Sequence, residues 1–177
     1  MQQETFKIYI VLSMSGTLFS RFLNLFMKSE FVHVSISLDK NLKTLYSFGR
    51  KKINTPWNAG FIEEHLDKGI FDMYNSMCEV LELELSKDEY NLLVEKLEDI
   101  ISHSDEYKYN FKGLFYTYFN VPKTFMKRFT CTQFVAYLLQ EIGALNIEKD
   151  ASLVLPKDYY DLNVRCVFRG RVHDYRG

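Results

Sequence analysis

The sequence predicts an α+β fold with a mainly antiparallel sheet, and three observations predict it. Alternating or β-branched runs typical of strands recur along the chain, longer stretches have the spacing of amphipathic helices, and the two kinds do not alternate strictly. The 177 residues contain no repeat, low-complexity tract or linker. We therefore expect one domain that covers residues 1–177.

Strand signals dominate the first fifty residues. Residues 6–13 (FKIYIVLS) are apolar and β-branched, and residues 31–39 (FVHVSISLD) alternate, with His33 on the polar face. A DKN turn then leads into residues 42–49 (LKTLYSFG), which predict a hairpin partner. Between the first two strands, residues 17–29 carry apolar side chains at helical spacing.

The middle of the chain is less regular. Residues 50–76 lack a clear period; RKKINTPWNAGF (50–61) predicts a loop or flap, and a short strand is expected at residues 69–74. Alternation returns in MCEVLELELS (77–86). The following stretch opens with Ser86 and Glu89, a capping box that predicts a long amphipathic helix.

The last third predicts helices and a closing strand. The aromatic stretch YNFKGLFYTYFN (109–120) is expected to be helical, and NVRCVFRGRVHDY (163–175) is expected to be a strand. Between them lies KRFTCTQFVAYLLQEIG, in which Thr130 is a suitable N-cap and Gly143 a suitable residue just beyond the C-terminus. This assignment places Cys131 at the first helical position.

Composition and charge exclude some functions. The net charge of −1 gives no basic bias towards nucleic acid, and the basic runs at residues 50–52 and 165–176 are explained as solvated faces. No basic region precedes the apolar run 8–12, which is too short for a signal peptide or a membrane span. We therefore expect no transmembrane segment and a cytoplasmic location.

Cysteines and aromatic residues complete the inventory. The three cysteines form neither an even framework nor the Cys/His spacing of a zinc site, so we expect reduced thiols and neither a metal nor another cofactor. The 15 Phe, 12 Tyr and one Trp exceed what a core of this size needs. Two readings stay open: a Phe-rich core, or rings that line a cleft or cover an apolar surface.

Cys131 has two readings as well. It lies on the apolar stripe of its helix, as a packed core cysteine would. At the first helical position, however, unpaired backbone N–H groups and the helix dipole favour a thiolate and can hold an oxyanion. A nucleophilic cysteine needs a histidine, and His33 is the only one of four in the middle of a strand. A lone strand histidine is more often structural.

These stretches resemble a known family. SGTLFSRFLNLF, FVHVSISLD, LYSFGRK and FTCTQFVAYLL, which span residues 15–139, are similar to the circularly permuted NlpC-type, papain-like cysteine hydrolases, in which the histidine precedes the cysteine. The resemblance implies a permuted papain-like fold, Cys131 as nucleophile and His33 as base, and a peptide-like amide substrate. The lecithin:retinol acyltransferase group has the same order, so acyl transfer or lipid hydrolysis is an alternative.

The sequence departs from this family in the residue that orients the histidine. Ser47, on the next predicted strand, is the first candidate, with the Tyr46 hydroxyl or a backbone carbonyl as alternatives. Asp39 shares the face of His33 but lies roughly 20 Å along the strand. Because no strong candidate for the orienting residue is present, a catalytically silent binding module with the same fold is a further interpretation of the sequence.

The remaining candidates belong to substrate and oxyanion binding. They are Thr132, Ser15, Gly16, Tyr46 and Trp57: Ser15 and Gly16 lie in the loop after the first strand, and Trp57 lies in the predicted flap. The expected partner is a small-molecule or peptide substrate, with a lipid as the alternative. The oligomeric state does not follow from the sequence.

Overall fold

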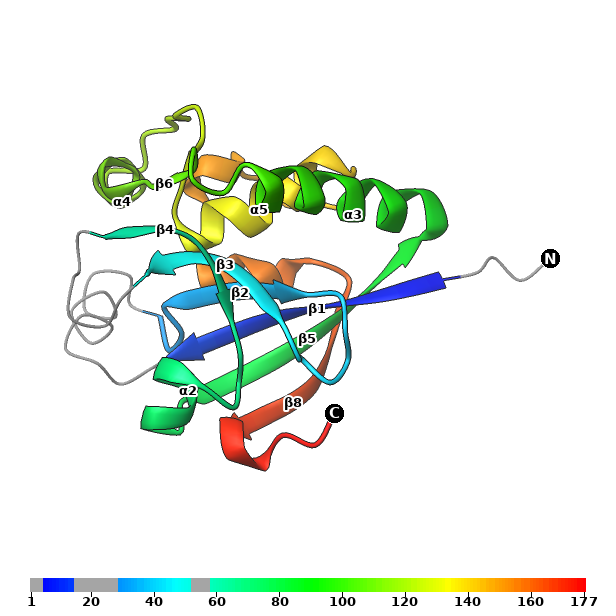
Figure 1. Cartoon of the computed structure of the whole chain (residues 1–177). Helices are drawn as coiled ribbons and strands as arrows, with labels where there is room; N and C mark the ends of the chain where they lie inside the picture. The colour runs from blue at the N-terminus through cyan, green and yellow to red at the C-terminus, as the bar shows by residue number, and fades with distance from the viewer. Residues whose placement is uncertain (1–4, 15–28, 52–57) are drawn as a thin grey trace.

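An eight-stranded sheet organises the chain. The computed structural model describes residues 5–14, 29–51 and 58–177, and the strand order is β7-β6-β4-β3-β2-β1-β5-β8 (Figure 1). All neighbouring strands pair antiparallel except β6 and β7, which are parallel, so the predicted α+β class with a mainly antiparallel sheet is confirmed. The strands are β1 (Thr5–Met14), β2 (His33–Ser37), β3 (Leu45–Arg50), β4 (Ala59–Glu64), β5 (Met77–Ser86), β6 (Lys108–Tyr109), β7 (Arg128–Phe129) and β8 (Val164–Arg171).

Helices lie against both faces of this sheet. In Figure 1, α3 and α5 lie above the sheet and α2 lies below it, beside the end of β8. The α-helices are α2 (Gly69–Tyr74), α3 (Lys87–Ser102), α4 (Phe111–Tyr118) and α5 (Cys131–Glu141), and the 3₁₀ turns are η1 (Ala151–Leu153), η2 (Pro156–Asp161) and η3 (Val172–Asp174). Among the described residues, no helix is long and apolar enough to cross a membrane.

The core has two parts, one on each side of the sheet. The larger cluster packs α3 and α5 on the sheet, with Phe134 of α5 against Phe48 of β3. The smaller cluster covers the other face and includes Phe71 of α2. Strand β1 contributes Ile10 to the first and Val11 to the second, which explains its continuous apolar run.

Two expectations for the middle of the chain are wrong. Residues 69–74 form helix α2 rather than a strand: Gly69 begins it at φ 65°, Asn75 ends it in the left-handed conformation, and Phe71 is its one buried side chain. Residues 59–64, which show no clear period, form β4 and pair with β3 along its whole length. The helix expected at residues 17–29 falls almost entirely outside the described residues.

The cysteine helix agrees with expectation. Thr130 is the N-cap of α5, and its hydroxyl accepts a hydrogen bond from the Gln133 amide (3.2 Å). The Gln133 side chain in return accepts from the Thr130 amide (3.1 Å), which completes a capping box. Gly143 follows the helix end at φ 78°, a conformation that glycine adopts without strain. Local sequence therefore fixes where α5 begins, and with it the place of Cys131.

Candidate functional site

Cys131 is the first residue of α5, and the capping box leaves backbone donors beside it. Gln133 and Phe134 donate their amides to the side chain and carbonyl of Thr130. Within the described part of the chain, the amides of Cys131 and Thr132 have no protein acceptor. Together with the helix dipole, these two N–H groups favour negative charge next to the sulfur.

Helix α5 brings the thiol to the beginning of β2. The body of α5 packs on β2 and β3, with Phe134 and Val135 fully buried. Its first turn places Cys131 Sγ 3.8 Å from the carbonyl oxygen of Val32, the residue that precedes His33. Cys131 is one of the causes that raise the pKa of the His33 imidazole, so the two side chains lie close together at this point, and the hydrogen bond of the sulfur is to the Val32 carbonyl. Two residues that are 98 positions apart in the chain thus belong to one site.

Glu64 is the second partner of the imidazole. The carboxylate Oε2 of Glu64, at the end of β4, lies 2.7 Å from Nε2 of His33. The Ser35 hydroxyl, two residues along β2 on the same face, donates to the same oxygen at 2.9 Å and lies 3.3 Å from Nε2. The side chains of His33 and Glu64 are 23% and 17% exposed, so both are held within the protein yet remain accessible from outside.

These contacts determine the charge and tautomer of His33. Burial lowers the pKa of the imidazole, but the charge of Glu64 and the interaction with Cys131 outweigh burial, so the pKa lies well above its ordinary value of 6.5. When the ring is neutral, an ionised Glu64 can only accept, so the proton resides on Nε2. The other ring nitrogen, Nδ1, then carries no proton and can accept one.

Small and apolar residues shape the surroundings of the imidazole. A Cβ atom on Gly49 of β3 would lie 2.6 Å from Cδ1 of Ile62 and 3.7 Å from Cε1 of His33. The glycine therefore lets Ile62 pack beside the ring. On the α2 side, the Phe71 ring centroid lies 6.4 Å from that of His33. The imidazole is enclosed by β3, β4 and α2, which restricts its rotation.

Two tyrosines lie near the sulfur. Burial, and then the charge of Cys131, raise the pKa values of both Tyr109 on β6 and Tyr159 in η2. The Tyr159 hydroxyl donates to the Thr132 carbonyl (2.7 Å) and so holds the first turn of α5. The Tyr109 hydroxyl has no hydrogen-bond partner within the described part of the chain, so it is a donor that a ligand at Cys131 can use.

The side chain predicted to orient His33 has a different partner. Ser47 is fully buried, and its hydroxyl donates to the Val34 carbonyl (2.6 Å), whereas Glu64 holds the imidazole. The alternative, Tyr46, belongs to the larger core cluster, with its ring 6.3 Å from that of Phe61. Neither side chain has a hydrogen bond to His33. The Ser47 hydroxyl is instead bonded to a backbone carbonyl of the neighbouring strand β2.

The other predicted site residues divide into two groups. Thr132 is buried directly after Cys131, and its hydroxyl lies 3.0 Å from that of Thr130, so its backbone amide is the group available to a ligand. Ser15, Gly16 and Trp57 lie outside the described residues. The Gln133 side chain bonds Asn110 and the Ser152 carbonyl and so ties α5 to its neighbours.

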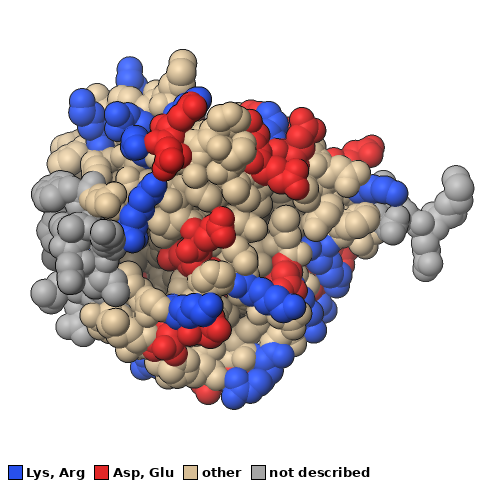
Figure 2. Space-filling view, in the orientation of Figure 1, with Lys and Arg blue, Asp and Glu red and all other residues tan. Residues whose placement is uncertain are grey.

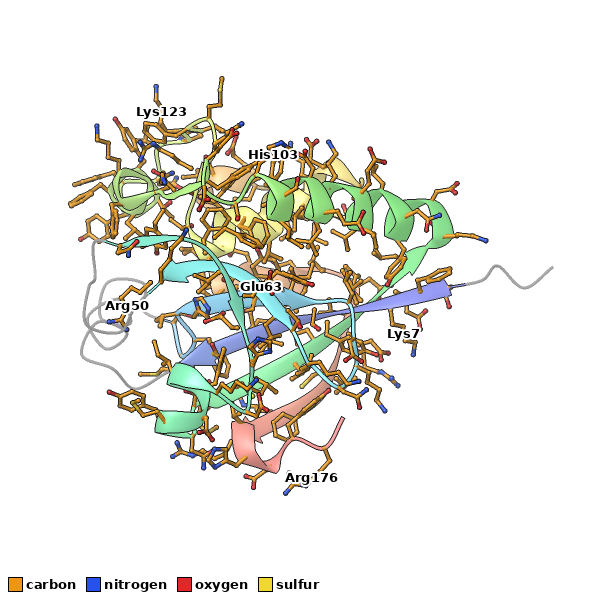
Figure 3. All side chains as sticks on the ribbon, in the orientation of Figure 1. Lys7, Arg50, Glu63, His103, Lys123 and Arg176 are labelled. Atoms are coloured by element: carbon orange, nitrogen blue, oxygen red, sulfur yellow. The ribbon has the colours of Figure 1, made fainter. Side chains whose placement is uncertain are left out.

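Sequence reasoning missed Glu64, Ser35 and Tyr109 as members of the site. The sequence does contain a pattern that could have indicated Glu64. Within AGFIEE, residues 60, 62 and 64 share one strand face and residues 59, 61 and 63 the other, so each face has a glutamate at its end. The pairing of β4 with β3 is what brings Glu64 to the face of the sheet that carries His33. Glu63 is exposed on the opposite face and is labelled in Figure 3.

The remaining histidines and cysteines have other environments. The His65 Nδ1 lies 2.6 Å from the Lys43 carbonyl, His103 pairs with Asp99 and His173 with Asp72. Cys78 is buried in β5, where burial and Glu79 raise its thiol pKa to about 12. Cys166 is exposed on β8. Only Cys131 interacts with a histidine among the described residues.

Comparison with known proteins returns no relative: no family model, no curated protein and no solved structure matches this chain. Within the described ranges, no group of three or more His, Cys, Asp or Glu side chains is arranged to hold a metal ion. The geometry around Cys131 is therefore what indicates a function.

Proposed function

We propose that this protein is a cysteine hydrolase with a circularly permuted papain-like fold, and that it cleaves a peptide-like amide bond through a thioester intermediate. One observation carries the proposal: Glu64 holds the His33 imidazole at 2.7 Å, and Cys131, at the first turn of a helix, lies close enough to raise the pKa of the same ring. A nucleophile, a base and a residue that orients the base are the parts that covalent acyl chemistry requires.

Each residue has a distinct step. Glu64 holds the Nε2 proton of His33, so that Nδ1 takes the proton of the Cys131 thiol. The thiolate attacks the carbonyl carbon, and the imidazolium then protonates the leaving amine as the carbon–nitrogen bond breaks. Water attacks the resulting thioester with His33 again as base, which releases the acid and restores the thiol.

The raised pKa of His33 supports this assignment. A raised imidazole pKa means that the ring holds a proton more strongly than an ordinary histidine, which suits it to take the proton of a nearby thiol. The Glu64 charge is the largest of the raising causes. The same carboxylate therefore sets the tautomer of the neutral ring and stabilises the charged ring.

Hydrogen-bond donors around the first turn of α5 would stabilise the oxyanion. The amides of Cys131 and Thr132 are directed out of the helix N-terminus, where the dipole adds to their effect. The Tyr109 hydroxyl is the further donor, since it lies close enough to respond to charge on the sulfur. We assign it to the carbonyl oxygen of the substrate.

The presence of Glu64 bears on the alternative of a silent binding module. That reading drew its support from the absence of an acidic or amide residue on the strand after His33. Glu64 supplies a carboxylate from the strand beyond, at 2.7 Å, so the set of three side chains is complete. A silent module would have no need for an accessible imidazole held between a thiol and a carboxylate.

A second candidate is acyl transfer to or from a lipid through the same three residues. It is favoured by one observation: exposed apolar side chains gather in α4 and the loop that leads to Cys131. Both reactions pass through the same thioester, and they differ only in the acyl donor and in the acceptor that resolves it.

Acyl-enzyme formation tests the proposal without knowledge of the natural substrate. The protein is mixed with p-nitrophenyl acetate, and p-nitrophenol release and intact mass are followed together. We expect a burst and a mass increase of one acetyl group at Cys131, both absent in Cys131→Ser and strongly reduced in His33→Ala. The control Cys166→Ser leaves both intact. Acetylation that is equal in wild type and Cys131→Ser would overturn the proposal.

A further inference from the structure

One part of the surface combines exposed apolar side chains with unopposed positive charge. It comprises the outward face of α4 and the loop to β7, and is called here the α4 surface: Lys112, Phe115, Phe119, Val121, Lys123 and Met126. Phe115, Phe119 and Met126 are 70%, 68% and 89% exposed. Exposed apolar side chains this concentrated mark an interaction site rather than an ordinary surface.

Hydrogen bonds fix the inward face of α4 to the rest of the protein. The exposed side chains on its outward face therefore belong to an anchored helix. The Asn110 side chain caps the helix by accepting from the Gly113 amide and donates to Gln133 of α5. One turn further on, the Thr117 hydroxyl donates to the Ser152 carbonyl (3.1 Å). These bonds orient the helix and leave Phe115 and Phe119, four residues apart, on its outer side.

The charge of this region has a single sign. From Tyr107 to Gln140 the sequence has five basic residues and no acidic one. Lys127 pairs with Glu106, and the Lys108 amine bonds the Asp105 carbonyl. In the part of the chain that the structure describes, Lys112, Lys123 and Arg128 make no ion pair. Figure 2 shows Lys and Arg side chains gathered over the α4 end of the molecule, and Figure 3 labels Lys123 there.

We propose that the α4 surface docks the protein on an anionic lipid membrane. Aromatic and aliphatic side chains that enter the interface, flanked by lysines that meet phosphate and carboxylate headgroups, are the combination by which peripheral proteins bind such membranes. The surface lies at an edge of the molecule in Figure 1, at α4 and the loop beyond it.

Other occupants fit these observations less well. A second copy of the chain, related by a two-fold axis, would place Lys112 and Lys123 opposite like charges. Single-stranded nucleic acid would use the aromatic rings for stacking, but Val121 and Met126 have no flat face for a base. A lipid interface accommodates all of these side chains.

The proposal does not depend on the chemistry at Cys131. Arg128, three residues before the cysteine, connects the α4 surface to the site, so a docked protein would hold Cys131 near the membrane. Vesicle binding is nevertheless measured without substrate. Failure of the docking proposal and failure of the hydrolase proposal are therefore separate results.

The test is co-sedimentation with vesicles of phosphatidylcholine, with and without phosphatidylserine. We expect binding only to the anionic vesicles, weakened by added salt. Each of two double variants, Phe115→Ser with Phe119→Ser and Lys112→Glu with Lys123→Glu, should lose roughly tenfold or more in partitioning. Met73→Ser, at an apolar residue of α2 that is 63% exposed, and Lys40→Glu, at an exposed lysine, are the matched controls and should bind like wild type.

Four results would overturn the proposal. They are no binding to anionic vesicles, equal loss in the control variants, dimerisation that the Phe115/Phe119 variant abolishes in light scattering, and tighter binding to a single-stranded oligonucleotide lost in the same variants. Circular dichroism and thermal unfolding establish that each variant is folded, so that loss of binding is assigned to the surface.

Discussion

The Nε2 atom of His33 and the Oε2 atom of Glu64 lie 2.7 Å apart, although the residues come from strands β2 and β4, with β3 between them in the sheet. The Ser35 hydroxyl donates to the same carboxylate oxygen, so Glu64 is itself held in place. This arrangement leaves one imidazole nitrogen for the thiol of Cys131 and makes the chemistry of the site testable residue by residue.

Cysteine alkylation is the first test of the pair. We expect removal of the imidazole in His33→Ala to slow the reaction of Cys131 with iodoacetamide by about tenfold or more at neutral pH, because the thiolate loses its counter-charge. Peptide mass spectrometry follows each cysteine separately. Exposed Cys166 should react equally in both proteins, and buried Cys78 should react in neither. A rate at Cys131 that is independent of His33 would contradict the pairing.

Replacement of Glu64 by glutamine tests the orienting role. The side-chain amide introduced by Glu64→Gln can donate to Nε2, which favours the tautomer with its proton on Nδ1, where it cannot accept a proton from the thiol. We expect the rate of acetyl-enzyme formation in Glu64→Gln to fall by about 10²-fold or more. Glu63→Gln, at the exposed neighbour on the other face of β4, is the matched control and should retain the wild-type rate. Equal rates in the two variants would exclude a role for Glu64.

The pKa of His33 predicts a pH-dependent stability. Because the pKa in the folded protein is raised above 6.5, the stabilisation from the charged imidazole is fully present below that value and is lost as pH rises through the folded pKa. From about pH 6 to about pH 10, the free energy of unfolding of wild type should therefore fall more than that of His33→Gln. Urea unfolding at several pH values measures the difference, and Glu64→Gln should resemble His33→Gln. Parallel curves would show that the pKa of His33 is not raised.

Tyr109→Phe removes one hydroxyl and leaves the ring. If that hydroxyl stabilises the oxyanion, acetyl-enzyme formation should slow by about 10²-fold, while the alkylation rate of Cys131, which forms no oxyanion, stays near that of wild type. The second measurement separates loss of a donor from a shift of the cysteine. Tyr107→Phe, at a ring that the Lys127 amine covers, is the control. Equal slowing of both reactions would indicate a structural role for Tyr109.

Truncation of Phe134 to alanine should lower the free energy of unfolding more than truncation of any other side chain in α5. It is fully buried between the rings of Phe48, Phe61 and Phe129, so Phe134→Ala leaves a cavity in the larger core cluster. We expect a loss of about 3–5 kcal/mol in the free energy of unfolding, measured by urea titration. Phe115→Ala, on the exposed face of α4, should change stability by less than about 0.5 kcal/mol. Similar losses at both positions would mean that Phe134 is not a core residue.

Local patterns were sufficient for most of the elements and for the place of two candidate site residues within them. The alternation of FVHVSISLD placed His33 on the polar face of a strand, and Thr130 as N-cap placed the start of α5 at Cys131. The same local reasoning failed at residues 69–74, which form a short helix that begins at Gly69 with positive φ, ends at left-handed Asn75 and buries one phenylalanine.

Local patterns could not predict Glu64 as the residue that contacts the imidazole. Whether Ser47 or Glu64 meets the imidazole depends on which strand lies beside which, and on the carbonyl of Val34 that takes the Ser47 hydroxyl. The proximity of Tyr109 to Cys131 likewise depends on the parallel pairing of β6 with β7, which no sequence period indicates.

The sequence by itself determined the periods, the caps and the charge pattern of this protein, because each of these is set by side chains within a few residues of one another. The tertiary structure decided which of those side chains meet. A contact between residues 31 or 98 positions apart is selected by sheet register and helix packing, in which the burial of Phe48, Phe134 and their neighbours outweighs any local preference. The site at Cys131, His33 and Glu64 is a consequence of that packing.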